Sequence, residues 1–123
     1  MNHGESLGRD FAAALADKDF GRITALLDPQ VDFRGLTPGR AWEASSATGV
    51  VSDVLAQWFE DSDHIDELLE VESGAFADRQ RVAYSFRGHN QDGPFVVEQQ
   101  VYFTEQEGRI AWMRVLCSGF RPG

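Results

Sequence analysis

The hydrophobic positions of this chain change their period partway along the sequence. Up to about residue 59, apolar residues recur every three or four positions in three stretches, which is the spacing of amphipathic helices. After about residue 63 they alternate with polar residues, which is typical of half-buried strands. The pattern therefore predicts a helical first half and a sheet in the second half.

Three helices are predicted in the first half. The first has an apolar stripe and ends near Asp17. The second is capped by Asp19 and ends at Asp28, because Pro29 disfavours helical geometry in the residue before it. The third begins at Ser45, Ser46 or Thr48, all of which can cap a helix. The three stripes are Leu7, Phe11, Ala14 and Leu15; Phe20, Ile23, Leu26 and Leu27; and Val51, Val54, Leu55, Trp58 and Phe59.

Five strands complete the prediction. A short strand spans 31–34 and is followed by a turn at 35–39 and a loop at 40–43. Turn residues at Ser73–Gly74, 90–94 and Glu107–Gly108 then separate four candidate strands. These strands are 64–72, 79–89, 95–105 and 109–119. The segment 64–72 fits a short helix nearly as well, and only its neighbours favour a strand.

The predicted order is α-α-β-α-β-β-β-β, which indicates an α+β domain. Helices should pack on the concave face of a curved antiparallel sheet. The domain should span 7–119, with a flexible N-terminal tail at 1–6 and a C-terminal tail at 120–123.

Composition narrows the classes of function. A net charge of −9 argues against nucleic acid as a partner and against anionic membrane surfaces, because both attract basic proteins. The single cysteine, Cys117, precludes an intrachain disulfide. The first residues carry no signal-peptide pattern and no apolar run reaches membrane-spanning length, so we expect a cytoplasmic protein.

Three segments carry a resemblance to a known family. They are 16–20 before the second helix, 27–33 leading into the first strand, and 108–116 in the last strand. With them, residues 7–119 resemble the nuclear transport factor 2-like superfamily, in particular its ketosteroid isomerase and SnoaL-like cyclase branches. The resemblance implies a cone-shaped α+β barrel whose cup holds an apolar small molecule.

The resemblance also tests for isomerase chemistry. It places the isomerases' tyrosine at Phe11, their catalytic base at Gly35 and their oxyanion carboxyl at Gln99. Arg34 and Leu36 supply no base either. Proton abstraction next to a ketone requires a base within about 3 Å of the carbon acid, so we do not expect ketosteroid isomerisation.

Strand alternation places two polar residues on the apolar face. Gln99 should point inward, where its amide needs a partner: backbone or water, which we favour, or a ligand carbonyl or hydroxyl. Tyr84 should lie in the core with its hydroxyl at the rim, the alternative being a hydroxyl that points into the cup.

The sequence supports three hypotheses of function. The first is a SnoaL-like domain that binds an apolar small molecule in its cup, with no reaction assignable. The second is an isomerase, cyclase or hydratase acting on a polyketide- or steroid-like ketone, which would need Asp32 or His89 to reach inside. The third is a structural or regulatory homodimer whose cup is filled by its own aromatic residues. The expected ligand-binding residues are Phe11, Leu15, Phe33, Trp42, Val54, Trp58, Tyr84, Phe86, Gln99, Val101, Met113 and Val115.

The convex face of the sheet is a candidate interface. Aromatic residues and arginine together with polar residues are typical of protein interfaces. We therefore predict a homodimer through the convex face, with an Arg114–Glu98 contact near the interface. The predicted residues are Glu98, Gln100, Tyr102, Trp112 and Arg114.

Other signals point to no further chemistry. The acidic residues between Glu60 and Glu72 should form a solvated face. His3, His64 and His89 lack the spacing of metal ligands, and the sequence holds no phosphate-binding loop, so neither a metal nor another cofactor is expected. Cys117 should be a core residue. In the loop at 40–43, Trp42 and Arg40 form either a lid, with Arg40 holding a carboxylate or enolate, or a plug, with Arg40 paired to Glu43 or another acid.

Overall fold

The helical elements precede most of the sheet, as the change of period predicts. The computed structural model describes residues 3–123. Its helices are α1 (His3–Ala16), α2 (Phe20–Leu26) and a continuous helical segment made of α3 (Ala47–Gly49), η1 (Val50–Leu55) and α4 (Ala56–Trp58). Its strands are β1 (Leu27–Thr37), β2 (Arg40–Ala44), β3 (His64–Phe76), β4 (Arg79–Asn90), β5 (Gly93–Gln106), β6 (Arg109–Cys117) and β7 (Arg121–Pro122).

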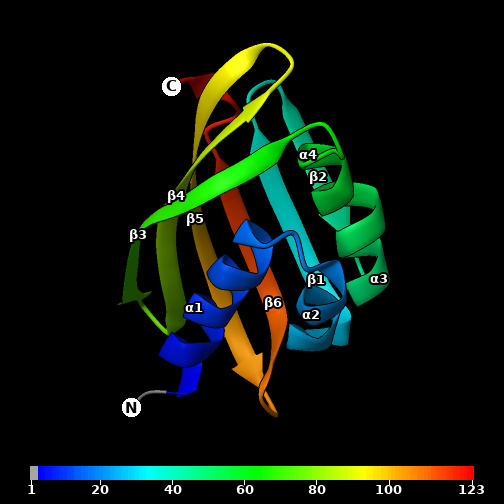
Figure 1. Ribbon diagram of the computed structural model, residues 1–123. Coiled ribbons are helices and arrows are strands. Elements are labelled where there is room, and N and C mark those ends of the chain that lie inside the picture. The colour runs from blue at the N-terminus through cyan, green and yellow to red at the C-terminus, as the bar shows by residue number, and fades with distance from the viewer. Residues whose placement is uncertain (1–2) are drawn as a thin grey trace.

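The strands form one curved, open, mixed sheet. Their order is β2-β1-β6-β5-β4-β3, and β7 pairs with β5 outside this path. Strands β3 to β6 are antiparallel neighbours, whereas β1 runs parallel to β6. The helices lie together on one face of the sheet (Figure 1). The expected cone-shaped α+β architecture is confirmed.

One face of β4, β5 and β6 is buried. The inward-facing residues of these strands are each at most 4% exposed. They are Val82, Tyr84, Phe86, Val97, Gln99, Val101, Phe103, Ile110, Met113 and Val115. The residues between them, such as Glu98, Gln100 and Leu116, are exposed on the outer face. The alternation read from the sequence is confirmed for β4 and β5 and for Met113 and Val115 of β6. Ile110, which alternation places on the outer face with Trp112, is buried instead, because the pairing of β5 with β6 shifts its register between Thr104 and Glu105.

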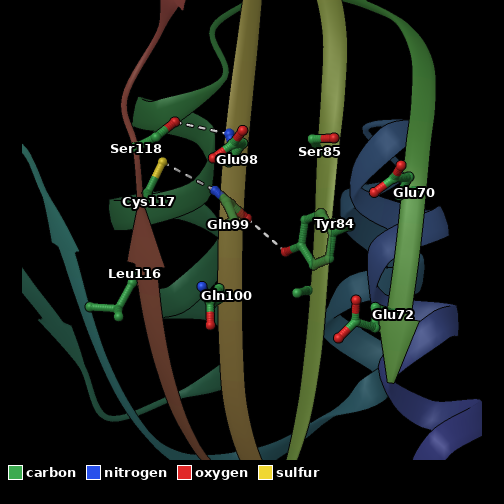
Figure 2. A pocket seen from close by; sticks show the side chains of 11 residues that line it. Glu70, Glu72, Tyr84, Ser85, Glu98, Gln99, Gln100, Leu116, Cys117 and Ser118 are labelled. Atoms are coloured by element: carbon green, nitrogen blue, oxygen red, sulfur yellow. Dashed lines mark hydrogen bonds between the residues drawn. The ribbon is translucent and has the colours of Figure 1, made fainter. Parts of the chain in front are cut away.

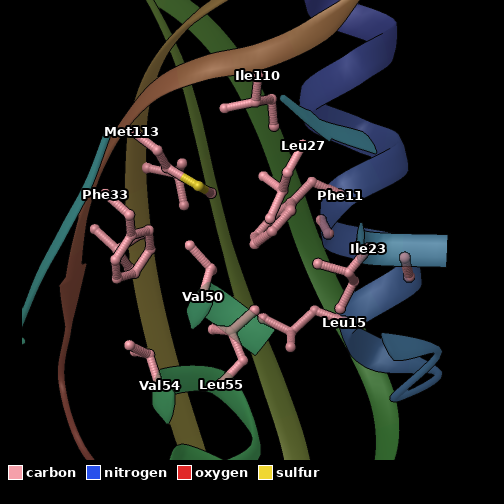
Figure 3. Close-up of a cluster of buried hydrophobic side chains, with 14 of the residues drawn as sticks. Phe11, Leu15, Ile23, Leu27, Phe33, Val50, Val54, Leu55, Ile110 and Met113 are labelled. Atoms are coloured by element: carbon pink, nitrogen blue, oxygen red, sulfur yellow. The ribbon is translucent and has the colours of Figure 1, made fainter. Parts of the chain in front are cut away.

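The helices close the inner face of the sheet. Phe11 and Leu15 of α1, Ile23 of α2 and Val54 of η1 pack against the buried strand residues (Figure 3). Two expected caps are present: Asp19 accepts a hydrogen bond from the Arg22 amide, and Ser46, of the three candidates, accepts one from the Gly49 amide.

Both ends of the chain contain regular secondary structure. Residues 3–6, which were expected in a flexible tail, belong to α1, because the first helical turn forms through backbone hydrogen bonds and needs no apolar side chain. Residues 1 and 2 lie outside the described part. The expected C-terminal tail contains β7, whose two residues pair with Phe95 and Val96. Phe120 stacks on Phe95 with 4.2 Å between ring centroids.

Three boundaries in the first half differ from the prediction. The helix α2 ends at Leu26, so Leu27 belongs to β1 rather than to the helical stripe. The strand β1 is longer than the predicted 31–34. The predicted loop at 40–43 is the strand β2, because Gly39 adopts a positive φ of 79° and turns the chain back beside β1.

The segment 64–72, which fits either a short helix or a strand by sequence, forms the first part of the strand β3. Its pairing with β4 continues through Ser73 and Gly74 to Phe76, so the turn predicted at Ser73–Gly74 is wrong. The chain turns instead at Ala77, which has a φ of 56°. Pairing with β4 over the longer span satisfies the backbone groups that a turn at Gly74 would leave unpaired.

Candidate functional site

The structure brings the predicted ligand-binding residues together on the inner side of the sheet. All twelve are buried there except Trp42, which is partly buried and packs against the same cluster. Helix α1 contributes Phe11 and Leu15, the segment η1–α4 contributes Val54 and Trp58, and the strands contribute the others. Whether they bind a ligand remains a prediction.

Three polar side chains form a chain across the inner face. The hydroxyl of Tyr84 on β4 donates to Oε1 of Gln99 on β5 at 2.6 Å. The amide Nε2 of Gln99 donates to Sγ of Cys117 on β6 at 3.4 Å. Figure 2 shows both contacts crossing three neighbouring strands. The strand register makes them, since Tyr84 pairs with Gln99 and Gln99 with Cys117.

This chain of contacts corrects two expectations. The Tyr84 hydroxyl points inward to Gln99 rather than to the rim, because Gln99 is its direct cross-strand neighbour. Gln99 is 2% exposed and is satisfied by side chains rather than by the expected backbone or water. Cys117 is half-buried and accepts a hydrogen bond, so it is more than an apolar filler.

Tyr84 is neutral at physiological pH. Burial raises the pKa of its phenol well above the usual range, and the neighbouring Cys117 raises it further. The phenol is therefore a hydrogen-bond donor and not a base in this environment.

At Gly35, where the resemblance places the catalytic base of the isomerases, another side chain fills the space. A Cβ atom at Gly35 would lie 2.9 Å from Cη2 of Trp58, which is closer than packed carbon atoms approach. Any side chain at this position would displace the indole. The position to which the resemblance assigns a base therefore holds the ring of Trp58 instead.

Neither alternative base reaches the interior. Asp32 is exposed and pairs with Arg114 at 3.1 Å. His89 is exposed, pairs with Asp66 at 2.7 Å and stacks on His64. Within the described residues, Asp63 is the only buried aspartate, glutamate, lysine, arginine or histidine, and Gln99 is the only buried side-chain amide.

Asp63 departs from the expected solvated acidic face. Its carboxylate accepts hydrogen bonds from the Glu60 amide and from Nδ2 of Asn90, and Nζ of Lys18 donates to its backbone carbonyl. Asp63 thus ties the α1–α2 turn and the start of β3 to the end of β4. The sequence held one sign of this role: Asp63 lies in the turn after α4, and aspartate in a turn commonly accepts a hydrogen bond from a nearby backbone amide.

The contacts of Trp42 favour a fixed wall over a mobile lid. Its indole Nε1 donates to the Thr37 hydroxyl at 2.8 Å, and its ring meets Trp58 edge-on at 6.0 Å. The guanidinium of Arg40 lies 3.5 Å from the centre of the Trp42 ring. Within residues 3–123, no ion pair joins Arg40 to Glu43.

Two hollows of the described residues lie along the sheet, and others lie beside the helices, between α2 and α3 and between α1 and β3. The first, about 370 Å³, is lined by outward residues such as Ser85, Glu98 and Gln100, and also by the three residues of the polar chain (Figure 2). The second, about 530 Å³, crosses β2, β1 and β6 and is flanked by Leu36 and Leu116. Phe33, Trp58 and Phe86 line neither of these two hollows; Phe33 packs against Trp58, and Phe86 packs against Tyr84.

The described residues offer no obvious place for a metal ion. No group of three or more histidine, cysteine, aspartate or glutamate side chains comes together between residues 3 and 123 in an arrangement that could hold one. Over the same range, no helix has the length and hydropathy to span a membrane.

Comparisons with known proteins agree on the fold. No protein-family model matches the sequence, and no curated protein matches it either. A Bacillus subtilis protein, provisionally assigned as an isomerase, superposes with a TM-score of 0.78 at 18% identity, over 96% of this chain and 90% of the other. A provisionally assigned polyketide cyclase from Xanthomonas campestris gives 0.72 at 17% identity, over 93% and 89%. A protein of unknown function from Burkholderia pseudomallei, described as NTF2-like, gives 0.69 at 18% identity, over 94% and 90%.

The chain has the nuclear transport factor 2-like fold. At these identities the similarity establishes architecture, and the activity named for each neighbour belongs to that neighbour.

The hydrogen bond between Tyr84 and Gln99 predicts that substitutions at the two positions have non-additive effects on the free energy of unfolding. Tyr84→Phe leaves the Gln99 oxygen without its donor, and Gln99→Leu leaves the phenol without its acceptor. Each single substitution should lower the free energy of unfolding by about 1–3 kcal/mol. The double variant should cost less than the sum by about 1 kcal/mol, measured by urea unfolding. Additive losses would contradict the bond.

The raised pKa of Tyr84 predicts a loss of stability in alkali. An unfolded tyrosine ionises near pH 10, whereas the buried phenol holds its proton to higher pH. The resulting stabilisation is complete below about pH 10 and is lost as the pH rises toward the folded pKa. The unfolding free energy should therefore fall more steeply above pH 10 in the wild type than in Tyr84→Phe, which retains Tyr102. Parallel curves would show that Tyr84 titrates normally.

Proposed function

We propose that the cup binds an uncharged, apolar small molecule, with no reaction assigned. The observation that carries the proposal is the composition of the inner face: apolar and aromatic side chains surround a few neutral hydrogen-bonding groups. A core that serves packing alone needs no polar side chain, and each one costs stability unless it is paired. Ligand sites in proteins typically combine an apolar lining with a few polar groups.

The same composition argues against an isomerase, cyclase or hydratase that works through a charged base. Gly35 provides no base, and Asp32 and His89 are engaged on the surface. Tyr84 keeps its proton at neutral pH. Binding therefore accounts for these residues better than acid–base catalysis does.

A fluorescent probe tests this proposal directly. N-phenyl-1-naphthylamine is uncharged and apolar, and its emission rises in an apolar site, so it should bind the wild type saturably with one molecule per chain. Val101→Phe adds a ring on the inner face and should weaken binding about tenfold, the equivalent of about 1.4 kcal/mol of lost contact. Thr104→Phe adds the same ring to the outer face of the same strand and should leave binding unchanged.

Two outcomes would contradict the proposal. Absence of saturable binding would favour a cup filled by its own side chains. Binding that Thr104→Phe weakens and Val101→Phe does not would place the probe on the outer face. Native mass spectrometry of protein purified from its own source would identify a retained ligand.

We further propose that the outer face of the sheet forms a homodimer. Leu36, Leu116 and Phe76 are 52%, 48% and 65% exposed there, and the guanidinium groups of Arg79 and Arg114 both lie over the ring of Trp112. The predicted Arg114–Glu98 contact does not form within one chain, since Arg114 pairs with Asp32 and Glu98 with Arg121. Exposed apolar patches of this kind commonly mark interfaces.

Sedimentation velocity tests the dimer. Leu116→Asp should raise the dissociation constant about a hundredfold or more, because an unpaired carboxylate in an interface costs several kcal/mol. Gln57→Asp adds the same charge at an exposed position on α4 and should leave the dimer intact. A wild type that sediments as a monomer at micromolar concentration would overturn the proposal.

A further inference from the structure

The larger of the two hollows along the sheet combines an apolar wall with charged side chains. It is about 530 Å³ in volume, within the range of about 300–1,000 Å³ typical of ligand sites. Its apolar wall consists of Leu36, Ala41 and Leu116, which are exposed on the outer face. Strand register brings them together, because Leu36 pairs with Ala41 on one side and with Leu116 on the other. The remaining lining residues are Arg34, Gly35, Trp42, Glu43, Arg114 and Val115.

Arg34 brings an unpaired guanidinium to this hollow. Among the arginines of residues 3–123, only Arg34 and Arg109 have side chains that make no ion pair, hydrogen bond or contact with an aromatic ring. The chain has 20 acidic residues against 11 basic ones, so carboxylates are in excess and most arginines have found one. Arg34 is therefore a positive charge that the fold itself leaves unused.

The charged neighbours of Arg34 leave it open to a ligand. Arg114, which pairs with it in register on β6, is engaged by Asp32 at 3.1 Å. Glu43, its register partner on β2, is exposed and makes no ion pair in the described part of the chain. A guanidinium presents its N–H groups in a fork that matches the two oxygens of a carboxylate. The hollow thus offers one such fork beside an aliphatic wall.

We propose that this hollow binds an amphipathic carboxylate, with Arg34 holding the carboxylate and Leu36 and Leu116 contacting its aliphatic chain. The ligand class is an unbranched monocarboxylic acid with a chain of medium length. The site is separate from the proposed cup site, which takes an uncharged molecule, so neither proposal rests on the other. The proposed homodimer would cover Leu36 and Leu116, so the carboxylate and the second copy would compete for this part of the outer face.

Three substitutions that each change one charge test the site with decanoate as the probe. Arg34→Gln should weaken decanoate binding about threefold to tenfold in isothermal titration calorimetry, because it removes the partner of the carboxylate. Arg109→Gln removes the other unpaired guanidinium, away from the hollow, and should leave binding unchanged. Glu43→Gln removes a like charge beside the ligand and should tighten binding about twofold.

Chain length tests the apolar wall. Octanoate carries the same carboxylate with two fewer methylene groups, so the wild type should bind it about fivefold more weakly than decanoate. Equal affinities for the two acids would show that the wall makes no contact and would overturn the inference. Absence of decanoate binding would overturn it as well, and so would equal weakening by Arg34→Gln and Arg109→Gln, which would show a response to net charge alone.

The inner face provides the control that separates this site from the cup. Val101→Phe should weaken binding of N-phenyl-1-naphthylamine and leave decanoate binding unchanged. Decanoate binding that Val101→Phe abolishes would place the acid in the cup and overturn the inference, while the proposed function would stand. Where the wild type sediments as a dimer, decanoate should lower the dimer fraction, and a dimer that persists with decanoate bound would contradict the competition.

Discussion

Burial of one face of β4, β5 and β6 requires each polar group on that face to find its partner inside the protein. Tyr84 and Gln99 are at most 4% exposed, so an unpaired donor or acceptor there would lose hydration without compensation. Tyr84, Gln99 and Cys117 meet the requirement by bonding to one another across three strands. The raised pKa of Tyr84 has the same origin, since the site that hides the phenol from water also disfavours its anion.

The same constraint decides what chemistry the cup supports. A carboxylate on the inner face would need its own counter-charge or several donors, and the chain supplies neither there. Gly35 has no side chain, and Trp58 occupies the space above it. With Trp58 in this space, the interior has no charged side chain at this position, which is consistent with the proposed binding of an uncharged molecule.

The charged side chains that stabilise the fold lie at turns and strand ends rather than on the inner face of the sheet. Asp63 joins the start of β3 to the end of β4, and Lys18 links the same turn to the end of α1. At the start of β5, beside the end of β4, the C-terminal residues add a short strand, and Phe120 stacks on Phe95. Contacts between segments distant in sequence therefore stabilise the strand ends, whereas apolar packing stabilises the inner face of the sheet.

The sequence by itself determined the periodic features of this protein. The alternation along β5 placed Gln99 on the inner face, and Asp19 and Ser46 were recognisable caps, because strand period and capping involve residues that are neighbours in the chain. Only the tertiary structure decided which residues contact one another across distant segments. The turn that makes β2, the acceptor of the Tyr84 hydroxyl, the burial of Asp63 and the position of Trp58 above Gly35 all depend on register and packing between distant segments, and local sequence does not encode these contacts.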